Sequence, residues 1–333
     1  LSRLVVEPLR AAAGAAKIWF VAPDGELWLY PWAALPTADG YLAEAVDLRY
    51  VTSGRDLLPR KSVPASGEAV IIADPDFDAG TGRERVAAEA PAGGRGIASL
   101  LGRVVRLPGT AVEAQAVAPK LAALTARKPK TLTGDQATER QLRAAARPRV
   151  LMLATHGFFL PPDLKHRAAR DDWFQTLTLP LTVGDEAVNP LRRSGLLLAG
   201  CNREPESGDD DGVLTGLDVL GLDLLGCEVV VLSACETGLG EVRDGEGVGG
   251  LRQAFLAAGA ERVMSTLWQV PDLESARLMA RCFELQATGR PAAAALREAQ
   301  LEVVQRRREK NAAAHPFFWA AYTLTGQQDA ARR

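Results

Sequence analysis

Apolar and polar positions follow two different periods along most of this chain. Continuous apolar runs, which predict strands buried on both faces, stand at 69–75, 149–154, 194–200, 228–234 and 261–268. Longer segments with apolar residues at helical spacing stand at 111–124, 247–260, 272–288 and 291–310. Strands that alternate with helices in this way predict an α/β fold, with a mostly parallel sheet that helices flank on both faces.

The first seventy residues show a different pattern, in which short strand-like runs are broken by turn residues. The runs 17–22 and 26–32 flank a Pro-Asp-Gly turn and predict a hairpin, and the run 46–51 predicts a further strand. We therefore expect an N-terminal β-containing extension of the sheet. The stretch 76–102 has no steady period and is expected to be a long loop.

Three local features are expected after residue 103. Residues 104–107 are expected to form a strand, and Thr138 is expected to cap a helix within 137–145, because a threonine hydroxyl accepts from free N–H groups. The helix over 111–124 is expected to bury one stripe. That stripe consists of Val112, Ala116, Leu121 and Leu124.

Composition narrows the class of protein. The chain has 333 residues, 47% hydrophobic and 24% charged, as in a folded protein of one large domain or two fused units. The net charge of −2 predicts no direct binding to nucleic acid or to an anionic membrane surface. No apolar run reaches the about 18 residues of a membrane span, and no signal peptide is recognisable. We expect a cytoplasmic protein, and the start at Leu1 suggests part of a longer chain.

Two of the predicted strands end in reactive side chains. His156 follows the run 149–154 by two positions, and Cys235 directly follows the run 228–234. The carboxyl ends of parallel strands meet at one rim of a sheet, so we expect the two side chains to lie close together. A thiol nucleophile, an imidazole and backbone N–H donors are the requirements of a cysteine peptidase. The N–H groups of Gly157 and Cys235 are the candidate oxyanion hole.

The remaining cysteines and histidines carry weaker signals. Cys201, Cys227 and Cys282 are expected to be buried packing residues, because free cysteine is commonly buried. Four scattered cysteines also predict neither a metal site nor a disulfide framework. His166 lies in a charged stretch and His315 precedes an aromatic run that suggests terminal core packing. The glycine-rich stretch 245–250 has no Gly-Lys-Ser/Thr ending, which argues against an NTPase.

A series of longer motifs resembles the CHAT family, the caspase-like domain associated with tetratricopeptide repeats. The motifs, in chain order, are APDGELWLYPWAAL, ATHG, NPLRRSGLLLAG, DGVLTGLDVLGLDL, VVLSACETGLG, GEGVGGLRQAFLAAGAERVMSTLWQVPD and HPFFWAAYTLTG. The resemblance runs from about residue 1 to about residue 326. It implies a fold similar to caspases, separase and gingipains, with His156 and Cys235 as the catalytic dyad.

The resemblance also implies a domain organisation. A sheet extension over 1–103 would pack on a caspase-like catalytic domain over 104–333, with inserted loops at about 161–193 and 201–213. No metal or organic cofactor is expected. The expected partners are a protein or peptide substrate and an upstream repeat, sensor region or regulatory protein.

Four further residues are candidates for a substrate-binding pocket. Ser233 stands two positions before the nucleophile, where caspases carry Gln and metacaspases Asp, and Glu236 follows the nucleophile directly. Trp268 and Asp272 belong to the WQVPD run, which matches WDVTD in separase-like sequences, so Asp272 would accept a basic substrate side chain. Two alternatives stay open: Asp272 caps the following helix, and Glu236 is an exposed turn residue.

The sequence therefore predicts a cysteine endopeptidase, expected to be the protease part of a larger regulated protein in bacterial defence or cell death. The alternative is a catalytically silent scaffold of the same fold that serves as an interaction module. The intact dyad in its full motif context favours the enzyme.

Overall fold

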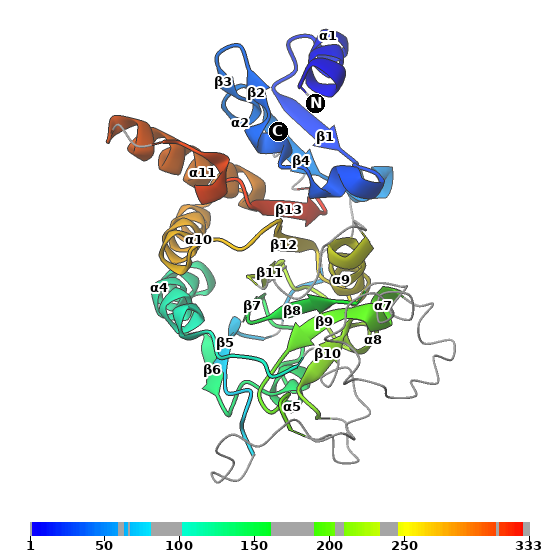
Figure 1. Ribbon diagram of the computed structural model, residues 1–333, viewed down its shortest axis with the longest axis vertical. Coiled ribbons are helices and arrows are strands. Elements are labelled where there is room, and N and C mark those ends of the chain that lie inside the picture. Colours follow the sequence, from blue (N-terminus) through cyan, green and yellow to red (C-terminus); the bar gives the residue numbers. More distant parts are fainter. Residues whose placement is uncertain are drawn as a thin grey trace, which may run out of the picture.

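An eight-stranded sheet forms the centre of the molecule in the computed structural model (Figure 1). The structure describes residues 2–58, 63–65, 67–80, 102–160, 190–203, 210–233, 246–310 and 313–328. The strand order is β1-β4-β13-β12-β11-β7-β5-β6. The bounds are β1 Ile18–Val21, β4 Asp47–Tyr50, β5 Val70–Pro75, β6 Lys130–Gly134, β7 Val150–Ala154, β11 Val229–Leu232, β12 Arg262–Thr266 and β13 Tyr322–Gly326.

The sheet contains two parallel blocks. Strands β12, β11, β7, β5 and β6 run parallel to one another, and β13, β4 and β1 form a second parallel set. The two blocks meet where β12 pairs antiparallel with β13. This arrangement confirms the predicted α/β class with a mostly parallel sheet.

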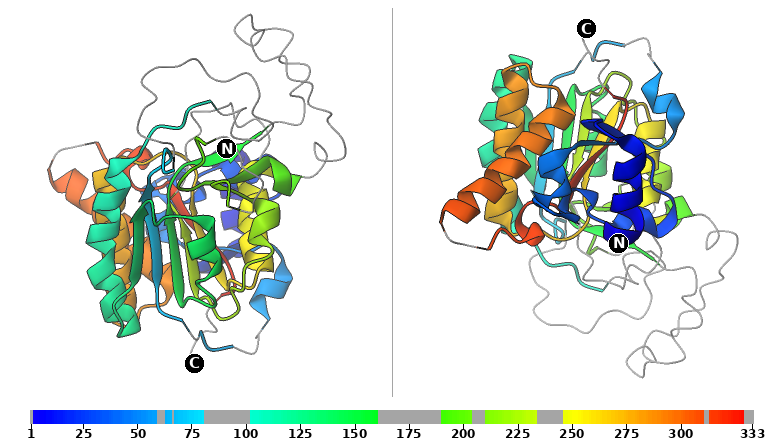
Figure 2. Two further views of the ribbon diagram at one scale, coloured as in Figure 1. Left: turned by 90° about the horizontal axis from the view of Figure 1, so that it is seen from below. Right: turned by 90° about the horizontal axis from the view of Figure 1, so that it is seen from above.

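Helices cover both faces of the sheet (Figure 2). On one face lie α4 (Pro108–Thr125), α10 (Asp272–Ala287) and α11 (Ala292–Glu309). On the other lie α5 (Glu139–Arg143), α8 (Gly216–Val219) and α9 (Glu246–Ala257). Successive strand residues point to opposite faces, so Ile71 packs towards α4 and Ile72 towards α5. The central strands need apolar residues at every position for this reason, which explains their continuous apolar runs.

The N-terminal region differs from the predicted hairpin. Strand β1 pairs in parallel with β4, and the run after the turn forms short 3₁₀ segments rather than a strand. Its aromatic side chains, among them Trp32, gather with Trp19 and Tyr50 in a separate apolar cluster instead of alternating across a sheet. The elements here are a π-helical turn Ser2–Val6, α1 Glu7–Ala13, η2 Gly25–Leu29, η3 Trp32–Ala34, β2 Pro36–Thr37, β3 Gly40–Tyr41, α2 Leu42–Ala45 and η4 Gly54–Leu57.

A small antiparallel sheet follows the histidine-bearing strand. It consists of β8 (Gly157–Phe159), β9 (Ser194–Leu197) and β10 (Val213–Thr215), with α7 (Pro190–Arg193) before β9. Phe158 packs in a cluster with Phe77 and Leu197 beneath this sheet. Residues 161–189 of the first expected inserted loop, at about 161–193, lie outside the described residues. Residues 204–209 of the second expected loop, at about 201–213, also lie outside them.

Several local predictions are confirmed and others are wrong. The Thr138 hydroxyl accepts from the backbone N–H of Gln141 at 3.2 Å and caps α5 as predicted. Residues 104–107 form no strand. Helix α4 buries a different stripe, because Val112 is 48% exposed. The buried positions are Thr110, Glu113, Ala114, Val117 and Leu121.

The terminal segments complete the central sheet in an unexpected way. Residues 316–318 form a 3₁₀ turn, η8, and the chain then enters β13 between β12 and β4. The sheet also crosses the boundary expected at residue 103, because β5 is an inner strand of the parallel block. Strands from both segments therefore share one hydrogen-bonded sheet.

Candidate active site

Polar side chains gather where β7, β11 and β12 end. In register, Leu153 of β7 lies opposite Leu232 of β11, which lies opposite Ser265 of β12. The residues that follow these positions include His156 and Ser233, and these therefore stand on one rim of the sheet. Cys235 and Glu236, the predicted nucleophile and its neighbour, lie outside the described residues.

The ring of His156 is buried and held by a backbone carbonyl. Its Nε2 atom lies 2.7 Å from the carbonyl oxygen of Val105, and its ring packs on Phe77 with centroids 5.4 Å apart. A carbonyl oxygen can only accept a hydrogen bond, so Nε2 is the protonated nitrogen. In the neutral imidazole, Nδ1 then carries the lone pair that can take up a proton.

The segment that carries Val105 is fixed on both sides. The Asn202 side chain pairs with Val104 twice, accepting from its N–H and donating to its carbonyl, both at 2.9 Å. The Arg106 guanidinium forms two hydrogen bonds to Asp74, at 2.7 and 2.9 Å. The carbonyl that orients His156 is therefore itself held by groups from two other segments of the chain.

A cavity of about 40 Å³ opens beside this rim. Its described lining comes from the ends of β7, β11 and β12, from the start of β13, and from α4 and α10 with the segments that precede these helices. The lining residues are Leu107, Thr110, Glu113, Thr155, Ser233, Thr266, Gln269, Val270, Asp272 and Tyr322. Thr155 directly precedes His156 in the chain, so the cavity lies next to the histidine end of the predicted dyad.

A buried carboxyl group lies at this cavity. Glu113 is only 2% exposed, and it accepts hydrogen bonds from the hydroxyls of Ser233 at 2.9 Å and Ser275 at 2.9 Å. The Tyr322 hydroxyl lies within hydrogen-bond distance of both serine hydroxyls. Burial raises the pKa of Glu113 to about 7, against the opposing effect of these hydrogen bonds. Asp272 contributes to the increase through its negative charge.

The structure places Asp272 at the cavity and Trp268 outside it. Asp272 is exposed and is the first residue of α10, whose N-cap is Pro271, so its side chain makes no capping hydrogen bond. The alternative in which Asp272 caps this helix is therefore not what the structure shows. The indole of Trp268 donates to the Phe317 carbonyl at 3.1 Å and packs against the core.

The other predicted positions are also placed. Gly157 begins β8, next to His156. Cys201, Cys227 and Cys282 are buried, and burial raises the pKa of each thiol to about 12, which suits packing residues. His315 is exposed and caps η8, where its Nδ1 accepts from Phe317. His166 lies outside the described residues.

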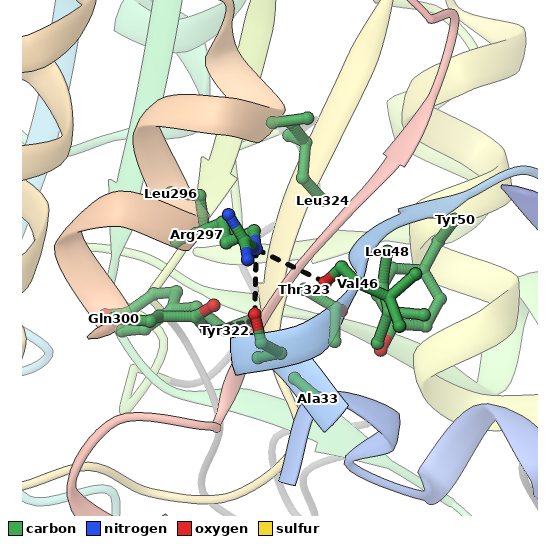
Figure 3. Close-up of a pocket in the computed structure, with 12 residues that line it drawn as sticks. Ala33, Val46, Leu48, Tyr50, Leu296, Arg297, Gln300, Tyr322, Thr323 and Leu324 are labelled. Atoms are coloured by element: carbon green, nitrogen blue, oxygen red, sulfur yellow. Dashed lines mark hydrogen bonds between the residues drawn. The ribbon is translucent and has the colours of Figure 1, made fainter. Parts of the chain in front are cut away.

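A second small cavity of about 30 Å³ lies between the N-terminal region and α11 (Figure 3). Arg297 of α11 points into it and donates from Nε to the carbonyl oxygens of Ala43 at 2.8 Å and Val46 at 3.2 Å. Among the described lining residues Arg297 is the only charged one. Its hydrogen bonds satisfy carbonyls at the end of α2, so this cavity is a feature of packing.

Two negative findings concern the described part of the chain. Within it, no group of three or more His, Cys, Asp or Glu side chains is arranged to hold a metal ion. None of the helices described is both long and apolar enough to cross a lipid bilayer.

The sequence did not reveal Val105 and Glu113. Every residue has a backbone carbonyl, so the identity of residue 105 could not indicate its contact with His156. Glu113 did have a signal, because an acidic residue at the spacing 110, 113, 117 and 121 stands on the buried face of α4. The predicted buried stripe ran through Val112 instead and did not include Glu113.

Comparisons with known proteins agree with the predicted resemblance. The family model of the CHAT domain matches residues 1–327. Tetratricopeptide repeat protein 28 of Mus musculus is 39% identical over 114 residues, 34% of this chain and 4% of that protein. The Homo sapiens protein of the same name is 32% identical over 206 residues, 59% of this chain and 8% of its own length. This chain thus matches only a small part of either relative.

One of the solved structures that this chain matches is the separase–securin complex of Saccharomyces cerevisiae. The match has a TM-score of 0.44 and 12% sequence identity, and covers 90% of this chain and 15% of that one. The family model spans nearly the whole chain, from the N-terminal helix to the last strand, and the predicted resemblance is confirmed. This chain belongs to the CHAT domain family.

Proposed function

We propose that this chain is a cysteine endopeptidase, with Cys235 as nucleophile and His156 as general acid and base. The observation that supports the proposal most is the 2.7 Å contact between His156 Nε2 and the Val105 carbonyl. It holds the ring at the sheet rim with Nε2 bound to the carbonyl, and we assign the proton transfer to Nδ1. Membership in a caspase-like family favours the same chemistry.

The reaction has two halves. The Cys235 thiolate attacks the peptide carbonyl carbon, and the N–H groups of Gly157 and Cys235 stabilise the resulting oxyanion. The C–N bond then breaks, the leaving amine takes a proton from the His156 imidazolium, and a thioester remains. His156 next accepts a proton from water, whose oxygen attacks the thioester and releases the new carboxyl group and the thiolate. The thiolate and the imidazolium are regenerated, and one water molecule has been added across the peptide bond.

The setting of this activity is part of the proposal. Two curated relatives are named as tetratricopeptide repeat proteins, which supports an upstream repeat region that senses or recruits a protein substrate. We place such a protein in the cytoplasm, in a regulated pathway such as bacterial defence or cell death. The pocket roles of Ser233, Glu236, Asp272 and Trp268 belong to the proposal as well.

Alkylation of the thiols tests the proposed chemistry. The chain and its His156→Ala variant are treated with iodoacetamide at neutral pH, and each cysteine is followed by mass spectrometry. Cys282 is the internal reference, because burial raises the pKa of its thiol to about 12. We expect Cys235 to react faster than Cys282 and to slow down in His156→Ala. Equal rates for the two cysteines, or no effect of His156, would favour the silent scaffold.

A further inference from the structure

The outer edge of the central sheet, which β1 forms, indicates how this chain associates (Figure 1). We propose that β1 pairs antiparallel with β1 of a second copy across a two-fold axis, so that the two central sheets join into one. The partner is thus an identical chain. This inference goes beyond the proposed peptidase activity and does not depend on it, because it uses no residue of the candidate active site.

The backbone of β1 presents hydrogen-bonding groups at this edge. Strand β1 ends the central sheet, and within the described residues β4 is the strand that pairs with it. N–H groups from the β4 segment donate to the carbonyl oxygens of Lys17 and Val21, at 2.7 and 3.0 Å. In a parallel pair, every second residue of a strand directs its N–H and C=O groups to the same neighbour, so Lys17, Trp19 and Val21 face β4. The N–H and C=O groups of Ile18 and Phe20 therefore point away from β4, to the outer edge.

The side chains at the same two positions are apolar and exposed. Ile18 is 44% exposed and Phe20 is 48% exposed, whereas Trp19 between them is buried in the N-terminal apolar cluster. Charged residues, prolines and bulges commonly keep an edge strand from pairing with another chain. Strand β1 contains no charged residue and no proline, and its pairing with β4 is regular from Ile18 to Val21. This edge therefore has the properties of a strand that pairs with another strand.

The register of β1 against itself favours a second copy as the partner. A two-fold axis through Trp19, perpendicular to the sheet, places Ile18 opposite Phe20 of the second copy. Both residues direct their backbone groups outward, so each such pair exchanges two hydrogen bonds. Directly opposite residues lie on the same face, so each exposed isoleucine is covered by a phenylalanine. Lys17, the charged residue next to β1, then faces Val21 of the second copy, and no like charges oppose each other.

An identical copy meets these requirements without any further element. A two-fold interface needs one patch that is complementary to itself, and the register through Trp19 gives β1 this property. The four residues of β1 offer much less surface than the roughly 1,200–2,000 Å² that a stable protein interface buries. We therefore expect a reversible dimer with a dissociation constant of about 1–100 μM.

Sedimentation equilibrium of the whole chain, from about 1 to about 300 μM, measures this association. Two variants change β1: Phe20→Lys places an ammonium group opposite Ile18 of the second copy, and Ile18→Pro removes one outward N–H group. Neither variant removes a hydrogen bond to β4, because both residues direct their backbone groups to the outer edge. Val112→Lys on α4 is the matched control, since Val112 is as exposed as Phe20, at 48%. Urea unfolding of each variant shows that it is folded.

We expect the molar mass of the wild-type chain to rise with concentration from 35.5 kDa towards twice that value. Phe20→Lys and Ile18→Pro should each raise the dissociation constant about tenfold or more, and Val112→Lys should leave it unchanged. A wild-type chain that stays monomeric at every concentration overturns the inference. A dimer that persists in both β1 variants overturns it too. The same holds if Phe20→Lys weakens the dimer and Ile18→Pro does not, because the copies would then not pair through their backbones.

Discussion

The carbonyl oxygen of Val105 accepts a hydrogen bond from Nε2 of His156 at 2.7 Å, across 51 positions of sequence. This contact sets the protonation pattern of the imidazole, because the acceptor can bind only the protonated nitrogen. It also joins the segment before α4 to the end of β7. In the proposed mechanism, the rate of proton transfer depends on the orientation of the His156 ring, and therefore on how firmly Val105 is held.

Removing the groups that hold this segment should slow the reaction of Cys235. Asn202→Ala breaks both hydrogen bonds to Val104, and Arg106→Ala breaks the pair to Asp74. We expect each variant to lower the His156-dependent alkylation rate about tenfold, since groups that orient a functional side chain commonly have effects of this size. The exposed pair of Arg103 and Asp78 offers the control, and Arg103→Ala should leave the rate unchanged. Equal rates in all three variants would contradict this positioning role.

The pKa of Glu113 predicts how stability depends on pH. Burial raises this pKa from 4.5 to about 7, so the folded chain binds a proton that the unfolded chain has lost over that interval. The free energy of unfolding should therefore fall as the pH rises from about 4.5 to about 7, by up to about 3 kcal/mol from this group. Glu113→Gln removes this contribution.

Urea unfolding at pH 5 and pH 8 measures the effect. Glu139, whose pKa burial also raises to about 7, adds a contribution of the same sign. The wild-type chain should lose more stability between the two pH values than either Glu113→Gln or Glu139→Gln. A wild-type loss no larger than that of Glu113→Gln would show that the carboxyl group is not buried in the way described.

Gly109 is required by its contact with Asp272. A Cβ atom at position 109 would overlap the Asp272 side chain, so in Gly109→Ala this side chain has to rotate away or the start of α10 has to move. We expect a loss of about 1–3 kcal/mol in the free energy of unfolding. Asp272→Ala in the same chain should recover part of it. Gly54→Ala, where a Cβ meets nothing within 4 Å, is the control in the same thermal denaturation series, and equal losses at both glycines would refute the contact.

Arg252 and Trp28 connect α9 to the N-terminal region. Arg252 is buried, its Cζ lies 4.0 Å from the Trp28 ring centroid, and burial lowers its pKa to about 10. Trp28→Ala should cost about 2 kcal/mol, because the ring is replaced by a methyl group next to a desolvated guanidinium. Adding Arg252→Met should recover part of the loss, since the buried charge is then gone. Urea denaturation of the two single variants and the double variant measures the coupling, and purely additive losses would argue against it.

The sequence predicted those features that depend on side-chain pattern. The continuous apolar runs became β5, β7, β11 and β12, and the strand ends placed His156 and Ser233 at one rim. The hairpin was wrong because aromatic residues after Gly25 pack into their own cluster, where tertiary contacts outweigh alternation. Val105 acts through its backbone, which no residue pattern encodes. Glu113 was missed because the buried face predicted for α4 was not the face that the structure buries.

Cleavage of a peptide library tests the central proposal most directly. The chain, its Cys235→Ala variant and its His156→Ala variant are incubated with the library, and new peptide termini are identified by mass spectrometry. We expect the chain to cleave chiefly after lysine and arginine, Cys235→Ala to be inactive, and His156→Ala to be slowed by a factor of about 100 or more. Cleavage that survives in Cys235→Ala, or no cleavage by the chain itself, would contradict a cysteine endopeptidase.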